Sequence, residues 1–176
     1  MAAVGLMTLK NLNAIPSARA TELFTACCGS SRWVAAMVAR RPFESLEALH
    51  GAADEIWNRL SEQDWREAFA HHPRIGETTS AVPQSDQGQQ WSASEQSGAT
   101  RASKSIRLAQ RDMNAQYERR FGYIYIVCAT GKTANEMFAI ARERLSNDPA
   151  TELKVAAEEQ RKIMRLRLEK LLEARS

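Results

Sequence analysis

A single run of this chain, residues 123–129 (YIYIVCA), has the β-branched and aromatic residues that are typical of a strand. One strand cannot form a sheet, because its backbone donors and acceptors need a neighbouring strand. We therefore interpret this run as a short buried extended segment or as the start of a helix. The remaining sequence is poor in turn residues, with 8 glycines and 5 prolines among 176 residues. These features predict an all-α fold: a single compact, bundle-like domain of about eight helices.

Capping residues and hydrophobic periodicity predict where the helices begin. Residues 61–64 and 133–136 match capping boxes, and residues 92–95 (SASE) match another, which would open a long helix ending at Gly122. A polar loop is expected over residues 77–90, and the final helix over residues 149 to about 174. Residues 1–7 are interpreted as a loose extension of the domain formed by residues 1–176. The expected caps are Ser17, Ser45, Ser61, Ser92, Thr133 and Asp148.

The sequence has no feature that indicates a membrane span, a secretory signal or a metal site. No apolar stretch approaches the roughly 18 residues that cross a bilayer, and the N-terminal residues lack a basic region followed by a long apolar one. The three cysteines, at positions 27, 28 and 128, have neither metal-ligand spacing nor the even number of a disulfide framework. We therefore expect a cytoplasmic protein that binds no metal and no membrane.

Positive charge is concentrated in one predicted helix, although the net charge of the chain is only +3. A basic face attracts anions or nucleic acid. A helical adaptor that binds nucleic acid through residues 101–120 is therefore an alternative function. A solvated helix face is the simpler interpretation, and we predict no nucleic-acid partner. The basic residues are Arg101, Lys104, Arg107, Arg111, Arg119 and Arg120, against Asp112 and Glu118.

Two residues near the polar loop are candidates for acid–base chemistry. His72 lies where the fourth predicted helix ends, and Pro73 restricts its backbone. Imidazole titrates near neutral pH, so a positioned histidine is a frequent general acid or base; a structural role is the alternative. Glu95 would lie with Ser92 and Gln96 at a helix N-terminus, where anions are favoured. The capping box alone would also account for Glu95.

The last predicted helix has polar residues on its apolar face. A guanidinium on an inward face needs a partner, because an unpaired buried charge is costly. That partner is either a carboxylate of the chain or a bound planar anion, which the guanidinium fork suits. Cys128, paired with His72, is a further alternative as the nucleophile of a hydrolase, but buried cysteines are normally inert. The apolar face consists of Leu153, Ala156, Gln160, Ile163 and Arg167.

Five separated blocks of the chain match one enzyme family in order. They are HHPRIGE (71–77), WSASEQ (91–96), NAQYERRFGYIYIVCATGKTANEM (114–137), RLSNDP (144–149) and ELKVAAEEQRKIMRLRL (152–168). Over about residues 8–170 the chain resembles the 2-oxo-4-hydroxy-4-carboxy-5-ureidoimidazoline (OHCU) decarboxylases of urate degradation. The resemblance implies a compact all-helical domain and a carboxy-lyase that converts OHCU to (S)-allantoin without a cofactor.

The resemblance also implies roles for individual residues. His72 matches the family's catalytic acid or base, because it directly precedes the proline, whereas His71 does not. Glu95 matches the carboxylate partner of that histidine. Residues 126–129 would present backbone groups to the substrate ring. The implied substrate contacts are Pro73, Ser92, Gln96, Ile126, Val127, Cys128, Ala129 and Arg167.

The reaction implied by the resemblance needs orientation and proton transfer. The conjugated C=N and C=O groups of the imidazoline ring can accept the electron pair that is left when CO2 departs. Arg167 and backbone amides would orient the carboxylate and stabilise charge on the ring, while His72 and Glu95 would supply acid–base help. The expected partner is a small anionic ureidoimidazoline, and the long, apolar-striped helix makes a homodimer plausible.

Overall fold

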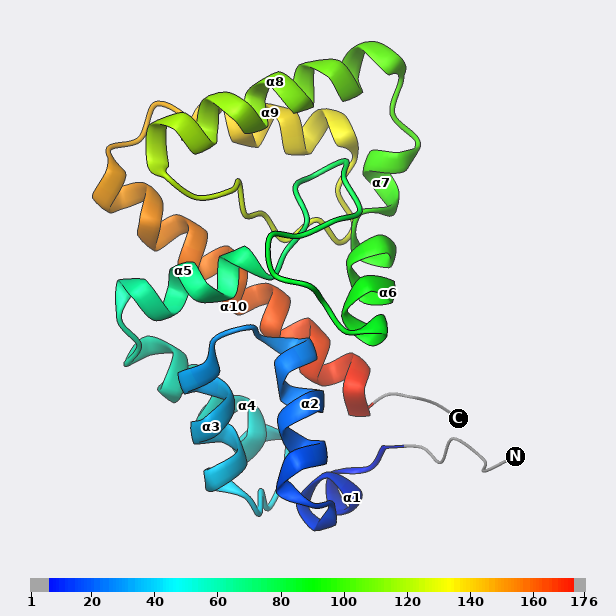
Figure 1. The fold of residues 1–176 in the computed structure, drawn as a ribbon, viewed down its shortest axis with the longest axis vertical. Coiled ribbons are helices and arrows are strands. Elements are labelled where there is room, and N and C mark those ends of the chain that lie inside the picture. Colours follow the sequence, from blue (N-terminus) through cyan, green and yellow to red (C-terminus); the bar gives the residue numbers. More distant parts are fainter. Residues whose placement is uncertain (1–6, 173–176) are drawn as a thin grey trace.

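The computed structural model of the chain describes residues 7–172, and within that range it has ten α-helices and no β-strand (Figure 1). The predicted all-α fold is confirmed. Eight of the ten helices have nine or more residues, in agreement with the predicted number, and the other two, α1 and α7, have 6 and 4 residues. The helices are α1 (Leu9–Ala14), α2 (Ser17–Cys27), α3 (Ser31–Arg40), α4 (Leu46–Asn58), α5 (Glu62–Ala70), α6 (Asp86–Glu95), α7 (Ser97–Thr100), α8 (Lys104–Phe121), α9 (Ala134–Arg144) and α10 (Pro149–Leu172).

Local capping explains where most of these helices begin. Four predicted caps accept a hydrogen bond from a backbone amide of the first helical turn: Ser45, Ser61, Thr133 and Asp148. Asp64 and Glu136 complete the two predicted capping boxes at Ser61 and Thr133. Ser17 is not a cap but the first residue of α2; Pro16 takes the cap position and makes no side-chain capping bond.

The capping box predicted at residues 92–95 is wrong. α6 begins at Asp86, where the hydroxyl of Ser85 accepts the amide of Gly88. Ser92 and Glu95 therefore lie in the last turn of α6 and not at a helix N-terminus. The polar loop is correspondingly shorter than predicted, since residues 86–90 are already helical.

The long helix expected after residue 92 is divided into three helices. Gly98 lies in the short α7, and a Cβ at this position would come within 2.1 Å of the Lys132 carbonyl oxygen. This close approach of two backbones is possible only for glycine. Ser103 then caps α8 by accepting the amide of Ile106. As predicted, that helix ends at Gly122, whose φ of 79° is in the left-handed region.

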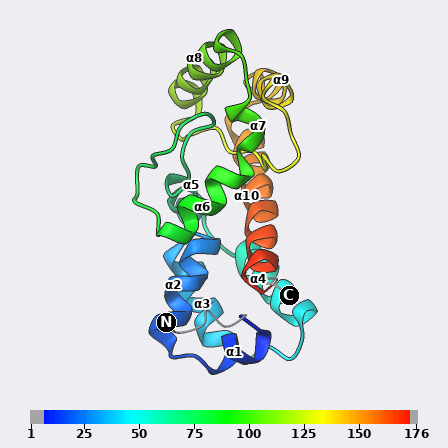
Figure 2. The same cartoon turned by 90° about the vertical axis from the view of Figure 1, so that its right-hand side faces the viewer.

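Helix α10 is the element around which the others are arranged (Figures 1 and 2). It crosses the middle of the molecule and contacts α2, α4 and α5. The α8–α9 pair lies at one end, and α2, α3 and α4 lie at the other. Along α10 the buried positions include Leu153, Ala156, Gln160, Ile163 and Arg167, so the predicted inward face is confirmed.

Residues 124–129 form the buried extended segment that the sequence predicts as one of two alternatives. The segment follows α8 and leads toward α9. Tyr123 and Tyr125 anchor its beginning by packing against Tyr117 of α8, with ring centroids 5.9 and 5.4 Å away. The phenol of Tyr125 donates a hydrogen bond to the Met137 carbonyl of α9 at 3.0 Å. The segment is thus fixed by side chains rather than by a neighbouring strand.

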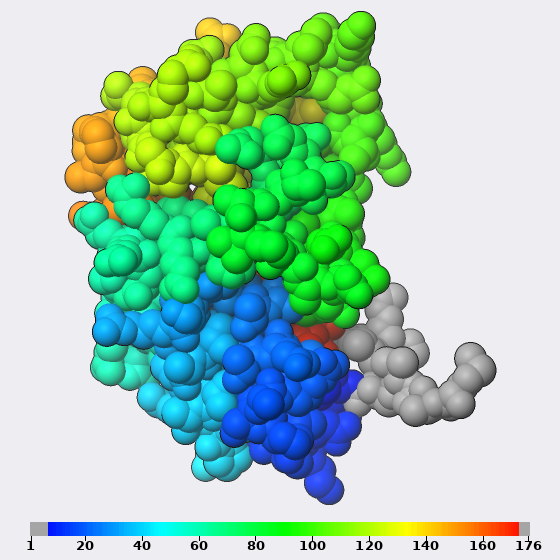
Figure 3. Space-filling view, viewed as in Figure 1, coloured from blue at the N-terminus to red at the C-terminus, as the bar shows by residue number. Residues whose placement is uncertain are grey.

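Residues 71–85 and α6 cover the middle of one face, where little of α10 is visible (Figure 3). Residues 1–6 and 173–176 lie outside the described part of the chain, so the predicted N-terminal extension and the end of the last helix near Ala174 fall largely there. None of the described helices is both long and apolar enough to cross a membrane.

Candidate active site

A buried ion pair joins the end of α6 to the inward face of α10. The Nε and Nη2 atoms of Arg167 donate to the two carboxylate oxygens of Glu95, at 3.0 and 2.9 Å. Only 4 % of the Arg167 side chain and 8 % of the Glu95 side chain are exposed. Lys170 adds a second cation, with its Nζ atom 3.2 Å from Glu95 Oε1. The inward arginine therefore has a carboxylate of the chain as its partner.

Further contacts fix the orientation of the Arg167 guanidinium. Its Nη2 atom donates to the Ser92 hydroxyl at 3.1 Å, and Nη1 donates to the Ala26 carbonyl of α2 at 3.1 Å. Ser92 in turn forms hydrogen bonds with the side-chain amide of Gln84. Four of the five guanidinium N–H donors are used, which leaves one on Nη1.

The ion pair keeps Glu95 ionised. Burial alone would raise the pKa of this carboxyl, but the hydrogen bonds and the positive charge of Arg167 outweigh burial, and Lys170 acts in the same direction. The pKa of Glu95 is therefore held below its ordinary value. At neutral pH the site contains a fixed carboxylate.

His72 is held by a glutamine on the inward face of α10, seven residues before Arg167. Its Nε2 atom lies 2.7 Å from Oε1 of Gln160, whose side chain is fully buried. An amide oxygen only accepts hydrogen bonds, so this contact places the imidazole proton on Nε2. Nδ1 makes no hydrogen bond to any residue from 7 to 172 and is the ring nitrogen that can accept a proton.

The surroundings of His72 keep the imidazole neutral. Burial is the main cause, and the charge of Arg167 adds to it; together they lower the pKa of His72 to about 3. Glu95 and Gln160 oppose this shift but do not cancel it. At neutral pH His72 is therefore uncharged, and Nδ1 is a lone-pair acceptor.

These residues meet at one small pocket of about 340 Å³. Its wall includes the extended segment. The Gln96 side chain, at the end of α6, accepts a hydrogen bond from the backbone amide of Gly76, in the loop after α5, at 2.9 Å. All but two of the predicted site residues line it. The lining is His72, Pro73, Ile75, Ser92, Glu95, Gln96, Tyr125, Ile126, Val127, Ala129 and Ile163.

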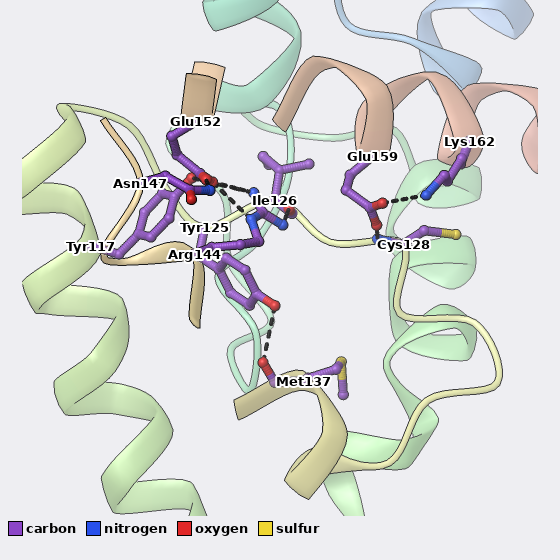
Figure 4. A network of polar contacts seen from close by, with 10 residues as sticks. All are labelled: Tyr117, Tyr125, Ile126, Cys128, Met137, Arg144, Asn147, Glu152, Glu159 and Lys162. Carbon is purple, nitrogen blue, oxygen red and sulfur yellow. Dashed lines mark hydrogen bonds and ion pairs between the residues drawn. The ribbon is translucent and has the colours of Figure 1, made fainter. Parts of the chain in front are cut away.

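A buried network holds the extended segment from α9 and α10 (Figure 4). Arg144 donates from Nη1 to the Ile126 carbonyl at 2.7 Å. The same guanidinium donates from Nε and Nη2 to Glu152 Oε1, at 2.8 and 2.5 Å. Glu152 also accepts the Tyr117 hydroxyl and, at 2.9 Å, the Asn147 amide. The position of Ile126 therefore depends on an ion pair outside the pocket.

Glu159 fixes the other end of the segment. Its carboxylate accepts the Cys128 amide at 2.7 Å and pairs with Lys162 at 2.5 Å (Figure 4). Lys132 donates to the Cys128 carbonyl at 2.7 Å. The backbone of Cys128 is therefore used within the protein, whereas the amides of Val127 and Ala129 make no hydrogen bond within the described chain. Those two amides are available to a ligand in the pocket.

Arg167 and Cys128 are the two predicted site residues that do not line this pocket. Arg167 is paired with Glu95 and, with His72, borders an adjoining cavity of about 320 Å³. Burial raises the pKa of the Cys128 thiol, so it stays protonated, which does not favour its role as a nucleophile. No group of His, Cys, Asp or Glu side chains among residues 7–172 is arranged to hold a metal ion.

Several functional neighbours were not predicted from the sequence. Lys170 lies on α10 close to Arg167, so its charge could have been found from helical spacing. Gln84 belongs to the polar loop, where no local pattern singles it out. Arg144 and Glu159 carry no signal, because each looks like a charged residue on the surface of a helix. Only the fold brings them to the extended segment.

Comparison with known proteins gives the class of this fold and site. A family model described as OHCU decarboxylase matches residues 13–169. The chain belongs to the OHCU decarboxylase family. The resemblance identified from the five sequence blocks is thereby confirmed.

Individual relatives agree with this assignment. The chain is 42 % identical over 146 residues to an Arabidopsis thaliana "uric acid degradation bifunctional protein", covering 82 % of this chain and 45 % of that protein. It is 30 % identical to a Mus musculus OHCU decarboxylase, covering 81 % and 79 %. A crystal structure of an OHCU decarboxylase in the presence of (S)-allantoin is 34 % identical, with a TM-score of 0.74, covering 86 % and 97 %. The chain thus spans less than half of the Arabidopsis protein, and also about a third of a similar Bacillus protein.

Proposed function

We propose that this protein catalyses the decarboxylation of OHCU to (S)-allantoin in urate degradation. The observation that supports this best is the convergence of a neutral histidine, an ionised carboxylate and two unused backbone amides on one pocket. Membership of the OHCU decarboxylase family and the 34 % identity to an enzyme solved with (S)-allantoin support the same substrate class.

The environments of the two titratable groups suggest how they divide the work. Loss of CO2 from the ring carbon leaves an electron pair that the adjacent C=N group takes up, and a proton must then reach one face of the ring. Neutral His72 accepts the hydroxyl proton of the substrate through Nδ1 and returns it to the ring carbon. A proton from water neutralises the ring nitrogen that took up the electron pair, so that one proton is consumed for each CO2 released. Glu95 orients the substrate by accepting its N–H or O–H groups. The charge that develops on the ring is stabilised by the amides of Val127 and Ala129.

The substrate carboxylate also needs a cation. We assign this role to the remaining Nη1 donor of Arg167, in the cavity that Arg167 shares with His72. Ser92, Gln96 and Pro73 complete the wall of the binding site, with Ile126 as an apolar contact. We propose that the ring itself accepts the electrons, so that the reaction needs no cofactor and no metal, and that the enzyme acts in the cytoplasm.

The test is to supply freshly generated OHCU to the purified protein. The ultraviolet absorbance of OHCU should disappear faster with the protein than without it. Circular dichroism should show that the product is the S enantiomer of allantoin. His72→Asn and Glu95→Gln should each lower kcat by more than 100-fold, since a positioned acid–base group contributes about 10²–10⁴. His50→Asn, which changes a histidine outside the pocket, is the matched control. Full activity of both site variants would refute the assignment, and no activity of the wild type would refute the function.

A further inference from the structure

A second and larger pocket lies beside the candidate active site. It has a volume of about 760 Å³ and is formed by the start of α8, the α7 region and the turn at residues 75–77. Ile75 lines both pockets, and the Gly76 amide that borders the larger one donates to Gln96 of the smaller one. Its floor is apolar, with Ala99, Ala102 and Ile106 among the lining residues.

One stripe of α8 gives this pocket a positive rim. Lys104, Arg107 and Arg111 are spaced by three and four residues, so they share one helical face, and all three line the pocket. Each is exposed, and none forms an ion pair with a residue between 7 and 172. The acidic side chain at the rim, Glu77, lies 3.7 Å from Arg74, but Arg74 is already paired with Glu118. Glu77 therefore offsets one of the three basic charges, and the rim keeps a net positive charge.

The wall of the pocket contains a buried acceptor without a donor. Asn114 donates from Nδ2 to the Ile75 carbonyl at 3.0 Å, which leaves its Oδ1 to accept Nε2 of Gln110 at 2.9 Å. These two bonds fix both side-chain amides in one orientation. Gln110 Oε1 then has no partner within the described residues, although Gln110 is only 5 % exposed. A buried acceptor left unpaired costs about 1–3 kcal/mol, so a ligand N–H that displaces the atoms covering Gln110 Oε1 and donates to it is favoured.

We propose that this pocket is a second binding site, for a planar heterocyclic carboxylate that carries a ring N–H. The apolar floor suits the face of a flat ring. The two guanidinium groups of Arg107 and Arg111 suit a carboxylate, to which they can donate bidentate hydrogen bonds. The ring N–H then supplies the donor that Gln110 Oε1 lacks. The basic stretch of α8 thus serves a small anion rather than nucleic acid.

The site can be tested with 5-fluoroorotate, which has the carboxylate, the ring N–H groups and a fluorine reporter. Titration followed by ¹⁹F NMR should show saturable binding to the wild-type protein. The double variant R107A/R111A, which changes only exposed side chains, should weaken binding more than tenfold, and Gln110→Leu should also weaken it. Arg119→Ala removes a base of the same helix outside this pocket and should leave binding unchanged. Binding should persist in Arg167→Met, because the pocket does not include that residue.

Two results would overturn the proposal. One is the absence of saturable binding by the wild type; if analytical ultracentrifugation then shows a change of oligomeric state in R107A/R111A, this face is a contact between copies of the chain. The other is binding that R107A/R111A leaves unchanged, or that Arg167→Met abolishes while its circular dichroism stays that of the folded wild type, since either would place the probe outside this pocket. None of these results depends on decarboxylase activity.

Discussion

Replacing Glu152 by glutamine tests whether the buried network behind the pocket is held together by charge. Glu152 is fully buried, and it accepts hydrogen bonds from Arg144, Tyr117 and Asn147. Glutamine keeps the size of the side chain and removes its negative charge. Arg144, which is 6 % exposed, would then be a buried cation with no ionised partner.

The expected loss of stability is large. Removing one partner of a buried ion pair costs about 3–5 kcal/mol, because the other charge stays buried without compensation. With a urea m-value of about 2 kcal/mol/M, the unfolding midpoint should fall by about 1.5–2.5 M. The double variant Arg144→Met/Glu152→Gln removes the stranded charge, so it should be more stable than the sum of the single variants predicts, by about 0.5–3 kcal/mol.

Urea titration followed by circular dichroism measures both quantities. Glu22→Gln is the control, because Glu22 pairs with Arg19 on the surface, where both side chains are more than half exposed, and it should hardly move the midpoint. A small shift for Glu152→Gln, or strict additivity in the double variant, would refute the reasoning. It would show that packing rather than charge holds this network.

Three further outcomes are expected. A Cβ at Gly29 would lie 2.2 Å from Cγ of His71, so Gly29→Ala should destabilise the fold by roughly 1–3 kcal/mol in urea or thermal unfolding. Gln160→Glu should raise the pKa of His72 and move the acid limb of the kcat/KM profile to higher pH, whereas the uncharged Gln160→Leu should not raise it. Because the pKa of His72 is about 3 in the folded state and ordinary, near 6.5, in the unfolded state, the unfolded chain binds one more proton between these values. Stability should therefore fall as pH decreases through this window, by at most about 1.4 kcal/mol per pH unit, and His72→Asn should flatten that slope in urea titrations.

The sequence predicted those parts of the fold that local interactions determine. The capping boxes at Ser61 and Thr133 and the end of α8 at Gly122 involve residues within one helical turn, so their patterns are visible in the chain. The motif at residues 92–95 has the same pattern but is not used, because Ser85 caps the helix first. The break at Gly98 depends on the distant carbonyl of Lys132, which no local pattern reports.

In the candidate site, too, local sequence patterns predicted individual residues but not the distant residues that contact them. The period of α10 placed Gln160 and Arg167 on its inward face, and Pro73 marked His72. Their partners could not be derived from spacing, because Glu95 is 72 residues from Arg167, and His72 is 88 residues from Gln160. The family resemblance supplied most of the residues that line the pocket, but it gave no indication of the network around Arg144.

Arg167 connects the protonation states of the two acid–base candidates. Its positive charge lowers the pKa of Glu95 by stabilising the carboxylate, and it lowers the pKa of His72 by opposing the imidazolium. The same guanidinium thus favours an anionic acceptor and a neutral base side by side. Without Arg167, burial would raise the pKa of Glu95, and the pKa of His72 would be less strongly lowered. The two side chains would then compete for one proton. The arginine on the inward face of α10 thus acts with burial to keep His72 neutral and with Lys170 to keep Glu95 ionised, which are the protonation states that the proposed mechanism requires.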